Sequence, residues 1–89
     1  MSDSLWYVYV LQCSDNSLYC GITTDVERRF SEHQSGVGAK YTRARLPVQL
    51  LVYWTEENRS TATKAEIAFK KRSKKRKLQI IEEQKSSKS

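Results

Sequence analysis

The chain has 89 residues, the length of one small domain, and a formal net charge of +6 at pH 7. Two cysteines exclude a disulfide framework, and no stretch approaches the roughly 20 apolar residues of a membrane span. The start lacks the basic segment of a secretory signal peptide. We expect one domain over residues 1–83, a flexible tail over residues 84–89 and a reducing, cytoplasmic setting. The charge favours nucleic acid as a partner, or else only aids solubility.

Residues 5–13 predict the first strand, because apolar and aromatic side chains fill both alternating sets. A strand that is apolar on both faces is usually central in its sheet. In the polar turn that follows, Asn16 suits the left-handed position of a three-residue hairpin loop. That loop pairs Tyr9 with Gly21 and puts Tyr9 and Tyr19 on one face, with space beside Tyr9. A four-residue loop would shift the register by one and separate the two tyrosines.

The second strand of the hairpin leads directly into a helix. Thr24 is a good N-cap residue, and Glu27, three residues later, completes a capping-box pattern. Gly36 is typical of a helix stop. Arg29 and His33 are four residues apart and share one stripe of the helix. A tyrosine and a glycine on a strand are thus followed by an arginine and a histidine on a helix, which together predict a phosphate-handling site.

Residues 37–46 interleave basic side chains with a tyrosine and a threonine. This composition fits a loop that contacts a nucleic-acid backbone and, equally well, an ordinary solvated connection. A third strand over residues 48–55 completes an antiparallel sheet. The expected nucleic-acid contacts in the loop are Lys40, Tyr41, Thr42, Arg43 and Arg45.

A second helix is expected to begin with Ser60 as its N-cap, and a short third helix to begin after Ser73. Glu66 lies near the apolar face of the second helix, where an unpaired charge is costly, so it needs a cation, hydrogen bonds or a metal. The basic run at residues 70–77 fits phosphate binding or a solvated helix face. The contacts expected there are Lys70, Lys71 and Lys74. The elements predict an α/β (α+β) fold in the order ββαβαα, a three-stranded antiparallel sheet flanked by helices.

The order and spacing of these motifs resemble those of the GIY-YIG nuclease superfamily, in particular its small stand-alone bacterial members. The first motif appears as Tyr7-Val8-Tyr9 and the second as Tyr19-Cys20-Gly21. The chain departs from the family pattern at Tyr7, where glycine is usual, and at Cys20, where isoleucine is usual. The segment GAKYTR at residues 38–43 resembles a signature of the stand-alone group. The catalytic arginine, histidine and metal-binding glutamate of the family match Arg29, His33 and Glu66.

The resemblance implies metal-assisted hydrolysis of phosphodiester bonds. One divalent ion, Mg²⁺ or Mn²⁺, would be held by Glu66 together with water and phosphate oxygens. Arg29 would bind a non-bridging phosphate oxygen. Tyr9 or Tyr19 would take a proton from the attacking water, and His33 would orient a tyrosine or assist the transfer. The residues do not divide these roles between the two tyrosines.

Two functions remain open. The first is a DNA endonuclease, acting on branched, damaged or single-stranded DNA as in DNA repair. The second is a nucleic-acid-binding module with the nuclease fold and little or no turnover. The chain has no room for a separate recognition domain, so a partner protein would supply specificity. For Arg29 and Glu66, a structural ion pair is the alternative to a shared catalytic site. Zinc is not expected, because two cysteines on opposite sheet faces and one histidine do not make a structural site.

Overall fold

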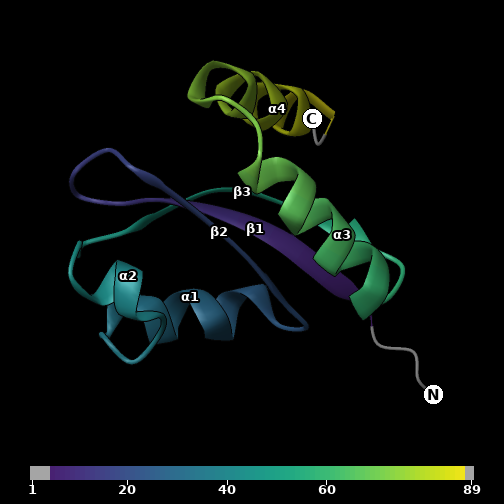
Figure 1. Cartoon of the computed structure of the whole chain (residues 1–89). Helices are drawn as coiled ribbons and strands as arrows, with labels where there is room; N and C mark the ends of the chain where they lie inside the picture. The colour runs from purple at the N-terminus through teal and green to yellow at the C-terminus, as the bar shows by residue number, and fades with distance from the viewer. Residues whose placement is uncertain (1–4, 88–89) are drawn as a thin grey trace.

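The computed structural model describes residues 5–87 of the chain. Within these residues three strands form one antiparallel sheet in the order β2-β1-β3. Helices α1 and α2 cover one face of the sheet, and helices α3 and α4 cover the other (Figure 1). The predicted α+β fold with the first strand at its centre is confirmed. The elements are β1 (Trp6–Gln12), β2 (Leu18–Thr23), α1 (Val26–Gln34), α2 (Lys40–Arg43), β3 (Gln49–Glu56), α3 (Arg59–Lys70) and α4 (Lys74–Ser87).

The hairpin of β1 and β2 has the predicted register. Asn16 adopts the left-handed conformation, with φ of 69°. Tyr9 pairs with Gly21, so the side chains of Tyr9 and Tyr19 lie on the same face of the sheet. Their ring centroids are 6.4 Å apart. The three-residue loop therefore places both motif tyrosines toward α1.

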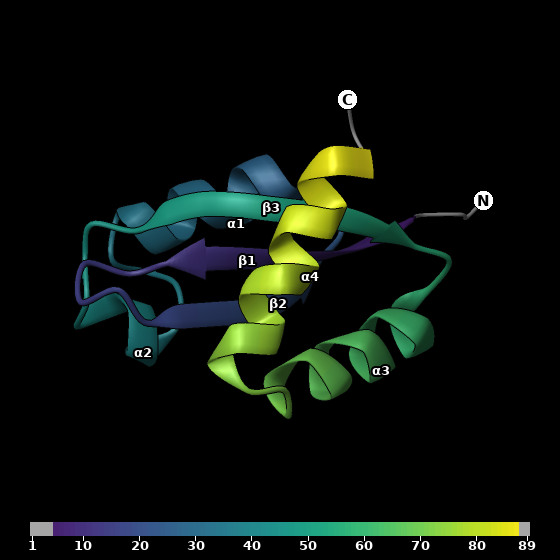
Figure 2. The ribbon, with the colours of Figure 1, turned by 90° about the horizontal axis from the view of Figure 1, so that it is seen from above.

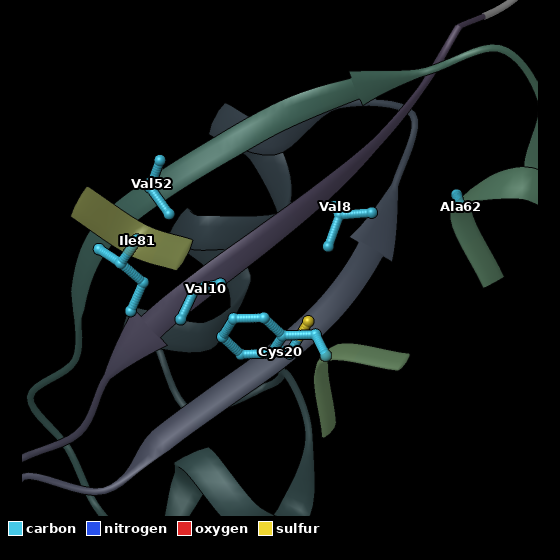
Figure 3. Close-up of a cluster of buried hydrophobic side chains, with 7 residues drawn as sticks. Val8, Val10, Cys20, Val52, Ala62 and Ile81 are labelled. Atoms are coloured by element: carbon cyan, nitrogen blue, oxygen red, sulfur yellow. The ribbon is translucent and has the colours of Figure 1, made fainter. Parts of the chain in front are cut away.

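Strand β1 contributes side chains to two separate cores, because its side chains alternate between the two faces of the sheet. Tyr9 belongs to the core under α1, which also contains Leu11, Cys13 and Val48. The core under α3 and α4 contains Val8, Val10, Cys20, Val52, Ala62, Phe69 and Ile81 (Figure 3). The two cysteines thus lie in different cores, on opposite faces of the sheet as predicted.

Both predicted N-caps are wrong by one or two residues. Helix α1 is capped by Asp25 and not by Thr24, because the Asp25 carboxylate accepts the backbone hydrogen bond three residues later at 3.0 Å. Helix α3 is capped by Asn58 and not by Ser60, in a reciprocal capping box with Thr61. In each case an Asx side chain, a strongly preferred N-cap type, lies one or two residues from the hydroxyl residue that the sequence pattern indicated.

Helix α4 is longer than expected and crosses the sheet above β1 (Figure 2). Residues 84–87, which we expected in a tail, are helical, while residues 88–89 lie outside the described residues. Burial of Ile81 anchors the helix beyond its first two turns. At the other side of the sheet, Gly36 ends α1 with φ of 87°, as predicted. No helix within residues 5–87 has the length and apolar character needed to cross a membrane.

Candidate active site

A chain of three buried side chains connects β1, α1 and α2. The Tyr9 hydroxyl oxygen lies 2.8 Å from His33 Nε2, and His33 Nδ1 lies 2.8 Å from Thr42 Oγ1. Tyr9 is 2% exposed, and His33 and Thr42 are completely buried. The histidine of α1 is therefore held between two hydroxyl groups in the interior of the domain.

Two glycines make room for this chain of side chains. A Cβ atom at Gly21 would lie 2.5 Å from the Tyr9 hydroxyl oxygen, and a Cβ atom at Gly38 would overlap the ring of His33. Gly21 thus lets the Tyr9 ring lie across the neighbouring strand, as the sequence predicted. Gly38 lets the segment before α2 close directly over the histidine.

Burial sets the protonation states of Tyr9 and His33. Burial, with a smaller contribution from Tyr19, raises the pKa of Tyr9 to about 12, although the Arg29 guanidinium acts in the opposite direction. Burial and the charge of Arg29 lower the pKa of His33. At neutral pH the pair is therefore a protonated phenol beside a neutral imidazole. Such an imidazole can accept the proton of the phenol.

Arg29, on α1, places a positive charge near Tyr9 and His33. Its guanidinium contacts Glu32 Oε1 at 2.9 Å, and 32% of its side chain is exposed. Its guanidinium also lies close enough to the Tyr9 phenol to oppose the rise in the pKa of that phenol. Together with Arg28 and Arg59, Arg29 lines a depression of about 370 Å³ at the end of β2. Three arginines and the single carboxylate of Glu32 give this depression a net positive charge that suits a phosphate.

A second depression, of about 350 Å³, lies at the other end of β2 and is lined by Tyr19, Tyr41 and Lys70 among others. The Tyr19 ring packs edge-on against the His33 ring, with centroids 5.2 Å apart, and stacks on Tyr41 at 6.0 Å. Lys70 Nζ lies 5.9 Å from the Tyr19 ring centroid and 3.1 Å from Glu66 Oε2. Lys70 thus connects Tyr19 to the carboxylate on α3.

The structure brings Tyr9, Tyr19, Arg29 and His33 into one cluster on the α1 face. Glu66 approaches from α3, which runs beside the edge strand β2 (Figure 2), and Lys70 lies between its carboxylate and the Tyr19 ring. Arg29 pairs with Glu32, and Glu66 pairs with Lys70. Among residues 5–87 no ion pair joins Arg29 to Glu66, so the structural pair that the sequence left open is wrong.

Glu66 fits the role of a single magnesium ligand. Its carboxylate is a hard oxygen donor, and 19% of the side chain is exposed. Magnesium is commonly held by one or two carboxylates, with water and phosphate oxygens completing the coordination. In the described part of the chain no group of three or more His, Cys, Asp or Glu residues could hold a metal. An ion at Glu66 would therefore depend on water and substrate for most of its ligands, and Lys70 would have to release the carboxylate.

The predicted nucleic-acid contacts separate into two groups. Thr42 was wrongly assigned, because its hydroxyl is buried against His33 and faces no solvent. The Arg45 guanidinium lies 3.9 Å from the Tyr41 ring centroid and pairs with Asp15 at 3.1 Å. Lys74 Nζ donates to a backbone carbonyl in the β1–β2 turn at 2.8 Å. The others keep exposed side chains: Lys40, Tyr41, Arg43, Lys70 and Lys71.

Sequence reasoning missed Glu32 and the connecting role of Thr42. Glu32 accepts hydrogen bonds from both Arg28 and Arg29 and so orients the arginine of the cluster. Its spacing of three residues from Arg29 was a visible signal for such a contact. The hydrogen bond between His33 and Thr42 had no local signal, because nine residues and a change of direction separate the two.

Comparison with known proteins identifies the family of this chain. The sequence profile of the GIY-YIG catalytic domain matches residues 5–79. The chain belongs to the GIY-YIG family. It is therefore a member of a family of nuclease domains, which act on nucleic acid.

Small proteins named UPF0213 resemble this GIY-YIG domain over most of their length. One from Cupriavidus necator is 54% identical over 70 residues, which cover 79% of this chain and 76% of the relative. One from Streptococcus sanguinis is 53% identical over 77 residues, which cover 86% of this chain and 88% of the relative. The solution NMR structure of a UPF0213 protein from Bacillus halodurans is 44% identical, with a TM-score of 0.58 and coverage of 88% of this chain and 83% of that one.

The two departures from the GIY-YIG motifs lie away from the Tyr9–His33 hydrogen bond. Tyr7, in place of glycine, packs edge-on against Tyr53 with ring centroids 6.0 Å apart. Cys20, in place of isoleucine, is buried in the core under α3. Both side chains serve packing, so the departures leave the cluster of Tyr9, Tyr19, Arg29 and His33 unchanged.

Proposed function

We propose that this GIY-YIG domain is a metal-dependent endonuclease that hydrolyses phosphodiester bonds in DNA. The proposal depends on one observation above all, the buried hydrogen bond from the Tyr9 phenol to His33 beside the Arg29 guanidinium. Family membership supports a nuclease reaction. The net charge of +6 supports an anionic polymer as substrate.

Tyr9 is the proton acceptor in this proposal, and His33 takes the proton that Tyr9 already carries. The raised pKa of Tyr9, about 12, keeps the resting phenol protonated. As the attacking water gives a proton to the phenol oxygen, the original phenol proton passes over 2.8 Å to His33 Nε2. The water oxygen bonds to phosphorus, and the ester bond from phosphorus to the leaving oxygen breaks. Tyr19 packs against the face of the same cluster and serves as a wall for the substrate.

Arg29 and Glu66 stabilise charge in this proposal. The guanidinium of Arg29, oriented by Glu32, binds a non-bridging phosphate oxygen more strongly as negative charge grows on it. Glu66 would hold the Mg²⁺ or Mn²⁺ ion, which when bound acts as a Lewis acid toward phosphate and leaving oxygens. Removing either side chain should therefore slow hydrolysis.

We expect the substrate to be recognised by its structure, such as a branch, a lesion or an unpaired strand, with specificity added by a protein partner. The two cationic depressions flank β2 at opposite ends and offer arginine and lysine groups to phosphates. Phosphate contacts position a protein on DNA but carry no direct sequence information.

A nucleic-acid-binding module with little or no turnover is the second candidate. The contact between Lys70 Nζ and Glu66 Oε2, at 3.1 Å, favours it, because the ammonium occupies the carboxylate that would hold the metal. A binder keeps its affinity for DNA in a chelator, whereas an enzyme of the proposed kind cuts only with a divalent ion.

The test is incubation of the protein with branched, nicked, linear and single-stranded DNAs, with Mg²⁺, Mn²⁺ or a chelator. The nuclease proposal predicts cleavage that needs the ion and is lost in Glu66→Gln, while DNA binding remains. Binding to these DNAs with no cleavage in any condition supports the binding module and contradicts the nuclease.

A further inference from the structure

Thr42 contacts the buried histidine from the side opposite Tyr9. We propose that Thr42 is a positioning residue: its hydroxyl oxygen accepts a hydrogen bond from His33 Nδ1 and so fixes the tautomer whose Nε2 receives the proton of Tyr9. The catalytic consequence rests on the proposed function. The tautomer itself is a property of the folded chain and is measured without substrate.

The hydrogen bonds of Tyr9 favour this tautomer. Its phenol oxygen lies 2.8 Å from His33 Nε2, and the positive charge of Arg29 acts on the same phenol. If Nε2 carried the proton, it would point at the phenol oxygen, and the buried proton of the phenol would lose the imidazole as acceptor. With Nε2 unprotonated, the phenol donates to His33, and the lone pairs of its oxygen stay available to the positive charge of Arg29.

The hydrogen bonds of Thr42 favour the same tautomer from the other side. A threonine hydroxyl has one proton, and that of Thr42 donates to the Ala39 carbonyl at 2.9 Å. Its oxygen then offers a lone pair to His33 Nδ1, which lies 2.8 Å away. This contact favours a proton on His33 Nδ1.

One contact competes with this arrangement. The backbone N–H of Ala39 also points at His33 Nδ1, but the separation is 3.4 Å, at the long limit for a hydrogen bond. The shorter contact with Thr42 dominates. Gly38 packs directly on the ring, and both His33 and Thr42 are completely buried, so solvent does not replace the hydroxyl.

This arrangement prepares His33 for the proton it receives. When Nε2 takes the proton of Tyr9, the imidazolium keeps an acceptor at each nitrogen, Thr42 at Nδ1 and the phenol oxygen at Nε2. An oriented acceptor behind a catalytic histidine is how other hydrolases select the productive tautomer. Here a neutral hydroxyl on α2 serves in place of a carboxylate.

The test is ¹⁵N NMR of the imidazole, which is unambiguous because the chain contains a single histidine. At pH 7.5 the wild type should show a protonated, pyrrole-type Nδ1 and a pyridine-type Nε2. Thr42→Ser, which retains the hydroxyl, should give the same pattern, and Thr42→Val should move the proton toward Nε2. Thr23→Val is the matched control, because it also removes a buried hydroxyl, one that bonds Asp25 and not His33.

On a DNA that the wild type cleaves, Thr42→Val should lower kcat by about 10-fold to 100-fold with KM unchanged, and Thr42→Ser should restore it. A wild-type histidine protonated at Nε2, or a Thr42→Val protein that keeps the proton on Nδ1, overturns the inference. If Thr42→Val does not fold, the spectra of the wild type and Thr42→Ser decide alone. A protonated Nδ1 in a wild type that cleaves no DNA supports the tautomer and contradicts the nuclease proposal.

Discussion

Replacement of Gly21 by alanine tests the packing that supports the hydrogen bond between Tyr9 and His33. In an ordinary strand the change from glycine to alanine is favourable by roughly 0.5–1 kcal/mol, because glycine loses more conformational freedom on folding. At Gly21 the new Cβ atom would lie 2.5 Å from the hydroxyl oxygen of Tyr9 and 2.7 Å from the ring carbon that bears it. Ordinary contacts between carbon atoms are about 3.5–4.0 Å. The Tyr9 ring has no free space to move into, since it is 2% exposed and bonded to His33.

Overpacking of this kind costs typically about 1–3 kcal/mol, so after the gain in the strand we expect Gly21→Ala to lose about 1–2 kcal/mol of unfolding free energy. For a domain of this size that is a fall in Tm of roughly 4–8 °C per kcal/mol. Thermal unfolding of the wild type, Gly21→Ala, Tyr9→Phe and the double variant measures the effect and its origin. Because Tyr9→Phe removes the nearest atom, the alanine should cost less in that background. A rise in Tm on Gly21→Ala, as in an ordinary strand, would refute the assigned clash.

Three further outcomes are expected. As pH falls from 7.5 to 5.5, urea unfolding should show a lower free energy of unfolding, by at most about 1.4 kcal/mol per pH unit. The reason is that the pKa of His33 is lowered in the folded protein, so the unfolded chain binds the proton at a higher pH. His33→Gln should lose less stability over the same range. Lys70→Met should bind Mg²⁺ more tightly in calorimetry, since it frees Glu66, whereas Lys71→Met should not. DNA affinity should fall steeply with salt, by a slope of roughly −0.9 per phosphate contact. A flat dependence would remove Lys40, Arg43, Arg45 and residues 70–77 from the interface.

The hairpin was predictable because its register depends on residues close in sequence. Asn16 marks the left-handed position, and the alternating pattern of β1 leaves only two registers to choose from. The helix starts were less predictable, because each has several residues able to cap within two positions of one another. The chain around them decides between Thr24 and Asp25, and between Ser60 and Asn58.

Part of the candidate site depends on contacts that no local pattern contains. The spacing of Arg29 and His33 indicated a shared helix stripe, but the full burial of His33 follows from the meeting of β1, α1 and α2. Helix α2 has four residues, too few for a periodic signal. The sequence pattern therefore indicated a solvated loop residue at Thr42, although its hydroxyl is buried in the folded protein.

The proposed function requires Arg29 and Glu66 to act in one catalytic site. This requirement is tested most directly by measuring the cleavage rates and the melting temperatures of Arg29→Gln and Glu66→Gln. Both residues make partly exposed ion pairs, with Glu32 and Lys70, of a kind worth about 0–1 kcal/mol, so both variants should melt close to the wild type. Cleavage should fall by roughly 10²-fold or more in each, if both stabilise charge in the transition state. Variants that melt far below the wild type yet cleave at its rate while folded would contradict the catalytic assignment.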